Sequence, residues 1–203
     1  MKLYSAETSP YARKVRILLH ETGQFDEVEI VGVSGTPIDT NTMPLAQNPL
    51  GKLPALERAD GPAIYDSRVI CRYLDARAGS KLYPEGNRLW ETLTLEATAD
   101  GMIDAAILMV YEFRVRPEEK RMPEWLEGQW GKIARSAEAI NARWMSHLNG
   151  PLDMGQIAVA CALGYVDFRH PTRDWRTGNA ALADWYTAFS NRESFAATVP
   201  PDA

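Results

Sequence analysis

Cysteine is nearly absent from the 203-residue sequence, which contains only Cys71 and Cys161. Both lie in stretches whose apolar pattern predicts buried helix, so we expect no disulfide framework and a reducing compartment, the cytoplasm. The three histidines, His20, His147 and His170, are widely scattered and do not complete a metal-ligand set with the cysteines. The sequence therefore predicts no metal and no resident cofactor.

Long apolar runs and a basic excess are also missing. No stretch approaches the roughly 18 apolar residues that span a bilayer, and no apolar signal segment follows Met1, so we expect no membrane association. The net charge of −5 and the pI near 5.3 argue against nucleic-acid binding, which usually needs a basic face. A small anionic ligand at a local site remains compatible with this charge.

The first third of the chain alternates strand and helix patterns. An Asp60-Gly61 step favours a hairpin turn between the last two strands, and a polar loop covers residues 34–42. Strands are predicted at 1–6, 26–33, 52–57 and 62–66, and helices at 10–22 and 67–78. The order β-α-β, loop, β-β-α predicts a thioredoxin-like α/β domain over residues 1–78.

Beyond residue 78 the pattern changes. Residues 79–87, GSKLYPEGN, are rich in turn formers and are predicted to be a linker. Strand signals then disappear, and helices are predicted at 88–114, 123–148, 156–168 and 180–189. The sequence therefore predicts a second domain, an all-α helical bundle over residues 88–203.

The first motif is Ser9-Pro10-Tyr11-Ala12, which is similar to the Cys-Pro-Tyr-Cys redox tetrapeptide of glutaredoxins with both cysteines replaced. Serine is a favoured N-cap and proline suits the first helical position, so starting a helix is its commoner role. A helix N-terminus also favours an anion, and a serine hydroxyl there can donate to a thiolate. Both interpretations stay open.

The second motif is NPLGKLPAL, residues 48–56. Pro54 at a strand start is a candidate for a cis peptide bond, which would turn the main chain of Leu53 outward to pair with an extended peptide. The alternative is an ordinary proline at the beginning of a strand. Lys52 is a solvated charge unless a carboxylate lies within reach.

The third motif is Asp66-Ser67 within YDSRVI. It is a plausible N-cap, but it also suits an α-amino acid, because Ser67 at a helix N-terminus can hold a carboxylate while Asp66 attracts an ammonium group.

In this order and spacing the three motifs resemble the glutathione-binding domain of cytosolic glutathione transferases, and the serine is similar to the bacterial serine- and cysteine-using branches. The resemblance implies that Ser9 is the catalytic residue that donates to the glutathione sulfur. It also implies a glutathione site formed by Lys52, Leu53, Pro54, Asp66, Ser67 and, from the partner subunit, Asp100. It further implies a homodimer whose helical domain, residues 88–203, supplies the electrophile pocket and dimer contacts. For Asp100 a solvated helix charge is the alternative.

The function implied is activation of the glutathione thiol, as co-substrate, for attack on a small apolar electrophile, as in detoxification. A glutathione-dependent reductase or peroxidase is a second reading, against which the serine counts; a non-catalytic glutathione-binding scaffold is a third. Tyr4 is expected to be a packed aromatic. Several side chains remain unassigned as electrophile contacts: Tyr11, Trp90, Met109, Tyr111, Phe113, Arg114 and Arg116.

The segment DMGQIAVACALGY, residues 153–165, resembles the buried helix of that family with its N-terminal capping box. Asp153 would be the N-cap and Gln156 the third helical residue, with Leu152 and Ile157 as a hydrophobic staple. The family more often has Ser or Thr at the cap and Asp at the third position. This departure concerns folding rather than catalysis.

Overall fold

The computed structural model describes residues 1–201. The chain divides into two compact units: one comprises Met1–Tyr83 together with the segment from Glu193 onward, and the other is Pro84–Arg192. The expected fold class, a thioredoxin-like α/β domain followed by a helical domain, is confirmed. Within residues 1–201, no helix combines the length and apolar character needed to cross a bilayer.

The first unit contains a four-stranded mixed sheet with the order β2-β1-β3-β4. β1 is parallel to β2 and antiparallel to β3, and β3 forms an antiparallel hairpin with β4. Each strand is shorter than the sequence pattern predicted. Their bounds are Lys2–Ser5 for β1, Glu29–Gly32 for β2, Ala55–Arg58 for β3 and Gly61–Ile64 for β4.

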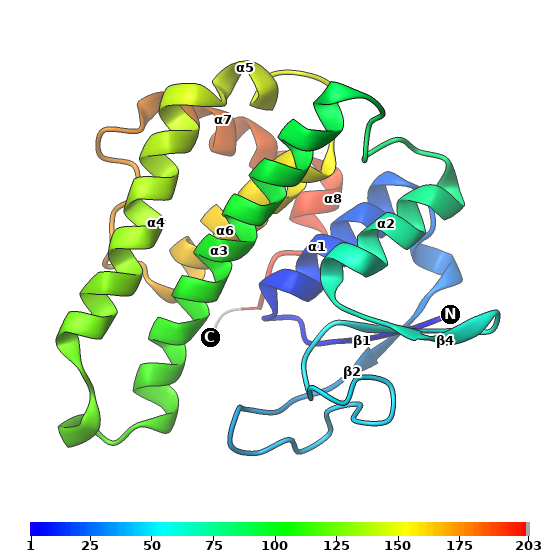
Figure 1. The fold of residues 1–203 in the computed structure, drawn as a ribbon, viewed down its shortest axis with the longest axis horizontal. Coiled ribbons are helices and arrows are strands. Elements are labelled where there is room, and N and C mark those ends of the chain that lie inside the picture. The colour runs from blue at the N-terminus through cyan, green and yellow to red at the C-terminus, as the bar shows by residue number, and fades with distance from the viewer. Residues whose placement is uncertain (202–203) are drawn as a thin grey trace. The chain divides into compact units, whose positions relative to one another are not determined.

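Two helices, α1 (Pro10–Glu21) and α2 (Ser67–Ala78), lie side by side on one side of this sheet (Figure 1). As predicted, each helix begins after a capping side chain, Ser9 or Asp66, and buries an apolar stripe along its length. α2 ends at Gly79, whose φ of 64° is left-handed and therefore suits glycine. The unit also holds the short helices η1 (Phe25–Glu27) and α8 (Glu193–Ala196).

The segment that contains α8 belongs to the first unit, whereas the sequence division assigned it to the helical domain. The reason is Arg13 of α1, which is 4% exposed and donates from Nη2 to the carbonyl of Phe195 (3.0 Å) and from Nε to the hydroxyl of Thr198 (3.3 Å). A buried guanidinium needs such acceptors, and the returning segment supplies them.

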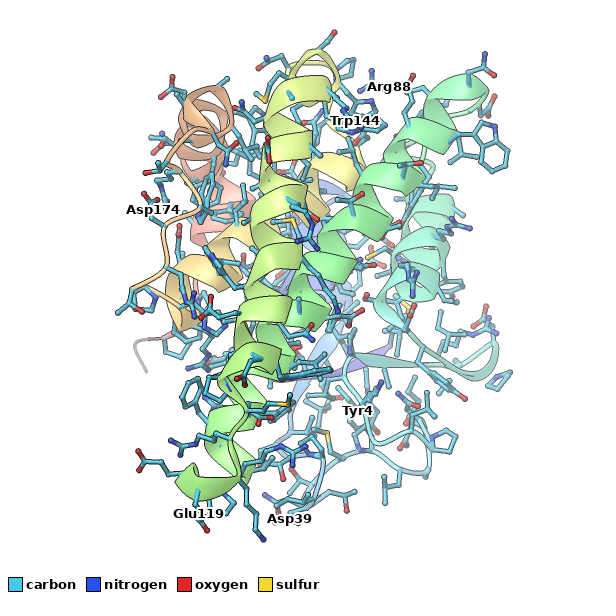
Figure 2. All side chains as sticks on the ribbon, turned by 60° about the vertical axis from the view of Figure 1, so that its left-hand side comes forward. Tyr4, Asp39, Arg88, Glu119, Trp144 and Asp174 are labelled. Carbon is cyan, nitrogen blue, oxygen red and sulfur yellow. The ribbon has the colours of Figure 1, made fainter. Side chains whose placement is uncertain are left out.

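The second unit is helical. In it α3, α4 and α6 run alongside one another (Figures 1 and 2), and α6 is buried along nearly its whole length. The predicted helix 123–148 is divided at Trp144 into α4 and α5. The helices are α3 (Asn87–Val115), η2 (Glu118–Lys120), α4 (Pro123–Arg143), α5 (Met145–Leu148), α6 (Met154–Arg169) and α7 (Ala180–Ser190).

Candidate functional site

The sheet topology brings the three sequence motifs to one end of the first unit. Ser9 follows the carboxyl end of β1, and Pro54 precedes the start of β3, which is antiparallel to β1 with Tyr4 opposite Ala55. β4 runs antiparallel to β3, so Asp66, just beyond its carboxyl end, lies at the same end of the sheet. Motifs separated by more than fifty residues therefore share one sheet end.

Ser9 is the N-cap of α1, as predicted, with its Oγ accepting a hydrogen bond from the N–H of Ala12 (3.3 Å). The first turn of α1 contains no acidic residue that would offset the partial positive charge of the helix N-terminus. A serine hydroxyl accepts through its oxygen and donates through its hydrogen. Capping therefore leaves the hydroxyl hydrogen free to donate to an anion, and the two sequence interpretations of Ser9 are compatible.

The Leu53–Pro54 peptide bond is cis, which confirms that expectation. Within residues 1–201 the N–H and C=O of Leu53 have no hydrogen-bond partner, so both can pair with an extended peptide. The buried side chain of Asn48 holds the preceding loop by donating to the Lys52 carbonyl (2.8 Å) and accepting from the Leu50 N–H (3.1 Å). The Lys52 side chain itself is exposed.

Asp66 is the N-cap of α2, and its Oδ1 accepts from the N–H of Arg68 (3.0 Å). Its other oxygen pairs with the Arg68 guanidinium at 3.1 Å, a contact that the sequence reading missed. Partial burial acts to raise the pKa of Asp66, but the charge and hydrogen bonds of Arg68 outweigh it and hold the pKa below 3.8. Asp66 is therefore ionised near neutral pH and suited to an ammonium group, while Ser67 beside it is buried.

Tyr4 is not placed as a donor to a thiol. Its hydroxyl donates to Oε2 of Glu57 on the neighbouring strand (3.0 Å), and Gln47 donates to the same oxygen (3.0 Å). Burial first, and then this bond and the charge of Glu57, raise the pKa of Tyr4 above 10.0. Tyr4 therefore has a structural role, as the sequence led us to expect.

The other predicted residues lie in the helical unit. Asp100 is 6% exposed in α3, so it is not the solvated helix charge considered as its alternative. Among the unassigned electrophile contacts, Trp90 (67%) and Phe113 (51%) are exposed rather than core residues, whereas Met109 is buried. In residues 1–201 no group of three or more His, Cys, Asp or Glu side chains is arranged to hold a metal ion.

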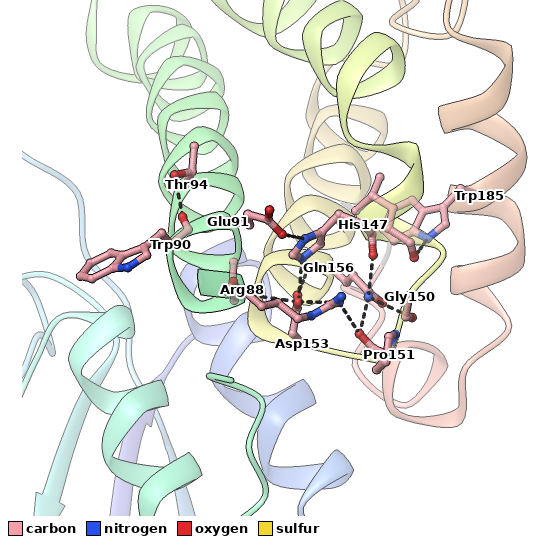
Figure 3. Close-up of polar contacts among 12 residues, drawn as sticks. Arg88, Trp90, Glu91, Thr94, His147, Gly150, Pro151, Asp153, Gln156 and Trp185 are labelled. Carbon is pink, nitrogen blue, oxygen red and sulfur yellow. Dashed lines mark hydrogen bonds and ion pairs between the residues drawn. The ribbon is translucent and has the colours of Figure 1, made fainter. Parts of the chain in front are cut away.

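A polar cluster of the helical unit surrounds Asp153, the N-cap of α6 (Figure 3). Oδ2 of Asp153 accepts from His147 Nε2 (2.7 Å) and from the Thr92 hydroxyl (3.0 Å), and it pairs with Arg88 (3.1 Å). Oδ1 accepts from the N–H of Gln156 at 3.2 Å. The carboxylate is 1% exposed, so this cluster is a buried support for α6 rather than an open site.

Gln156 does not act as the third residue of a usual capping box. Its side-chain Nε2 donates to the carbonyls of His147 (3.4 Å), Gly150 (3.3 Å) and Pro151 (2.7 Å). An aspartate, which is an acceptor only when ionised, would have no donor for these carbonyls. The departure from the family pattern is therefore explained by the loop before α6.

Comparison with known proteins identifies the family of this chain. Residues 8–77 match the family model for the glutathione S-transferase N-terminal domain, and residues 123–188 match that for the C-terminal domain. A curated relative, the GST-like protein YibF of Escherichia coli (strain K12), is 32% identical over all of both chains. The chain belongs to the glutathione S-transferase family.

Two solved structures of a glutathione transferase family member from Pseudomonas fluorescens Pf-5 are also similar to this chain. One contains bound glutathione; it is 44% identical with a TM-score of 0.96, and the match covers 98% of each chain. The other contains bound S-(propanoic acid)-glutathione; it is 44% identical with a TM-score of 0.92, and the match covers 99% of this chain and 100% of the other. That Pseudomonas fluorescens protein therefore binds both glutathione and S-(propanoic acid)-glutathione.

Proposed function

We propose that this glutathione S-transferase family protein activates the thiol of glutathione, which loses its proton and attacks a small apolar electrophile, so that the glutathionyl group is transferred through its sulfur. The observation that carries the proposal is the meeting of Ser9, Leu53 and Asp66 at one end of the sheet, each with a group suited to one part of the tripeptide. The glutathione bound in a relative of 44% identity supports the same ligand.

Each group has one task. The hydroxyl of Ser9 donates to the sulfur, and the N-terminus of α1 adds its partial positive charge. The main chain of Leu53 before Pro54 pairs with the cysteinyl residue, and Lys52 offers its charge to the glycyl carboxylate. Asp66 and Ser67 hold the ammonium and carboxylate of the γ-glutamyl end. Asp100 of the partner subunit reaches that ammonium group in a cytoplasmic homodimer.

The expected activation follows from how far the pKa of the bound thiol is lowered. A free thiol with a pKa near 8.5 is only about 3% thiolate at pH 7. A hydrogen bond and a helix N-terminus that lower this pKa by about two would stabilise the thiolate by about 2.7 kcal/mol and make it the main form. The population gain is roughly 25-fold, so holding the electrophile close must supply much of the remaining rate. The serine supports the proposal that the chain is of the bacterial serine- and cysteine-using type within the family.

Calorimetric titration tests the proposal. Glutathione is titrated at pH 7 in two buffers of different ionisation enthalpy, and S-methylglutathione, which has no titratable thiol, is the matched ligand. A bound thiol pKa near 6.5 predicts release of about 0.7 proton for glutathione and about none for the thioether. Equal release by both ligands would contradict thiol activation and leave a glutathione carrier; absence of binding would overturn the proposed ligand.

A further inference from the structure

The helical unit contains a cavity of about 460 Å³ between α3, α4 and the segment that follows α6. This volume suits a small organic molecule. Its apolar wall is formed by Met109 and Val110 of α3 and Leu126 of α4, all of which are buried. The remaining wall is unusual for an apolar pocket, because it contains the side chains of Arg114, Arg169, His170 and Arg173.

Two of these four basic groups carry no unbalanced charge: one is paired with a carboxylate and the other is uncharged. Arg173 donates from Nη1 to Oε2 of Glu127 at 2.9 Å, and its Nη2 pairs with the other carboxylate oxygen. Burial, against the opposing effect of the Ala106 carbonyl, lowers the pKa of His170 below 6.5, so the imidazole is neutral at pH 7. Neither group is therefore an uncompensated charge in this cavity.

Arg114 and Arg169 differ from them. In the part of the chain that the structure describes, no carboxylate lies within 4.0 Å of either guanidinium. Arg169 has a hydrogen bond with Tyr165 and stacks over Phe168 (3.9 Å), but its Nε is buried without a hydrogen-bond partner. Burial, and then the like charge of Arg114, lower the pKa of Arg169 from its ordinary value.

Helix ends explain only part of this arrangement. Arg114 and Arg169 lie in the last turns of α3 and α6, where the helix dipole favours a cation. That effect accounts for one arginine at each end. It does not account for the buried Nε of Arg169, which costs free energy unless a hydrogen-bond acceptor completes the site. Arg114 is exposed, so its guanidinium lies at the solvent-facing side of the cavity and is available to the same acceptor.

We propose that this cavity binds the carboxylate of a small apolar carboxylic acid through Arg114 and Arg169. A carboxylate matches the fork of a guanidinium, and the apolar wall of Met109, Val110 and Leu126 accommodates the hydrocarbon part.

Titration with 3-phenylpropanoate and with its neutral isostere, 3-phenylpropanamide, tests the site. We expect the full-length protein to bind the acid about tenfold or more tightly than the amide, because the bonds to the arginines are charge-assisted. R114Q and R169Q should each lose this preference while their weak binding of the amide is unchanged. R143Q, which removes an exposed arginine of α4 outside the cavity, should behave as the wild type.

Equal affinity of the wild type for acid and amide would overturn the inference, and so would a preference that survives in both R114Q and R169Q. If R169Q does not fold, R114Q and the wild-type comparison still decide. Titration of glutathione on the same samples separates the two proposals. Arginine-dependent acid binding without glutathione binding would leave the cavity assigned and refute the transferase; the reverse result would refute the cavity alone.

Discussion

Replacing Ser9 separately by alanine and by glycine distinguishes the two tasks of its hydroxyl. S9A removes the N-cap of α1 and should lower the free energy of unfolding by about 1 kcal/mol, whereas glycine, a tolerated N-cap, should lower it by only a few tenths. Both variants lose the donor to the sulfur, so both should raise the pKa of bound glutathione equally, by about one to two. Urea unfolding and thiolate absorbance against pH measure the two effects.

Unequal thiol pKa values in S9A and S9G would indicate that α1, rather than the hydroxyl, determines the acidity of the sulfur. Unchanged values in both would remove Ser9 from the catalytic assignment. The contrast is possible because Oγ accepts from Ala12 while the hydroxyl hydrogen remains available.

At Asp66 the prediction concerns charge alone, since D66N keeps an N-cap oxygen and loses the ion pair with Arg68. The pKa of Asp66 is held below 3.8, so its charge stabilises the fold above that pH, and this contribution is lost as the pH falls through the folded pKa. The pair is exposed, so the wild type should exceed D66N by at most about 1 kcal/mol at pH 7, and the difference should shrink as the pH falls below 3.8.

The role of Asp66 in ligand binding is tested by measuring the glutathione affinity of D66N and of a control variant. D66N should weaken binding about tenfold, as expected for a lost charge-assisted bond, while D60N, which removes an exposed carboxylate of the β3–β4 turn, should not. Similar losses in both variants would mean that the ammonium group of glutathione responds to the net charge of the unit rather than to Asp66.

Elements that depend on neighbouring residues could be predicted from the sequence. The N-caps Ser9, Asp66 and Asp153 bond to N–H groups two or three residues ahead, so a short pattern contains both partners. The break at Trp144 could not be predicted, because the helical pattern continues through it and His147 turns toward a carboxylate of another element. Arg68 was missed for a different reason: an exposed arginine has no distinctive signal.

The α6 cap predicts a stability contribution larger than that of an ordinary N-cap. D153A would leave Arg88 and Thr92 without their common acceptor inside the helical unit, and should cost about 3–5 kcal/mol. D153N keeps a cap oxygen but cannot balance the charge of Arg88, so it should fall between D153A and the wild type. All six tryptophans lie in this unit, so urea unfolding followed by their fluorescence measures it.

D184A is the matched control for this series, because Asp184 is an exposed carboxylate of α7. Its effect should stay within about 0.5 kcal/mol. A D153A value as small as that of D184A would show that the buried cluster contributes nothing beyond its own desolvation cost.

For the whole molecule, the division into α/β and helical units follows from the loss of strand patterns after residue 78, and the comparisons confirm this class of fold. The membership of the last segment does not follow. The contact between Arg13 and Phe195 spans 182 positions, and no local pattern in α1 indicates which distant carbonyl will accept from its guanidinium. Long-range polar contacts of this kind become visible only in three dimensions.

Because the segment from Glu193 onward packs on α1, we expect T198V to destabilise the first unit, although valine and threonine are similar in size and the position stays buried. Thr198 is 1% exposed and accepts from Nε of Arg13, so valine removes a hydrogen-bond acceptor of this buried guanidinium at a cost of about 1–3 kcal/mol. V199A, in the same segment at a 60% exposed position, should change stability by less than about 0.5 kcal/mol. Because the first unit contains no tryptophan, amide hydrogen exchange in α1 is the measurement. Faster exchange in T198V alone supports the hydrogen bond between Arg13 and Thr198. Equal exchange in both variants would show that this bond does not stabilise α1.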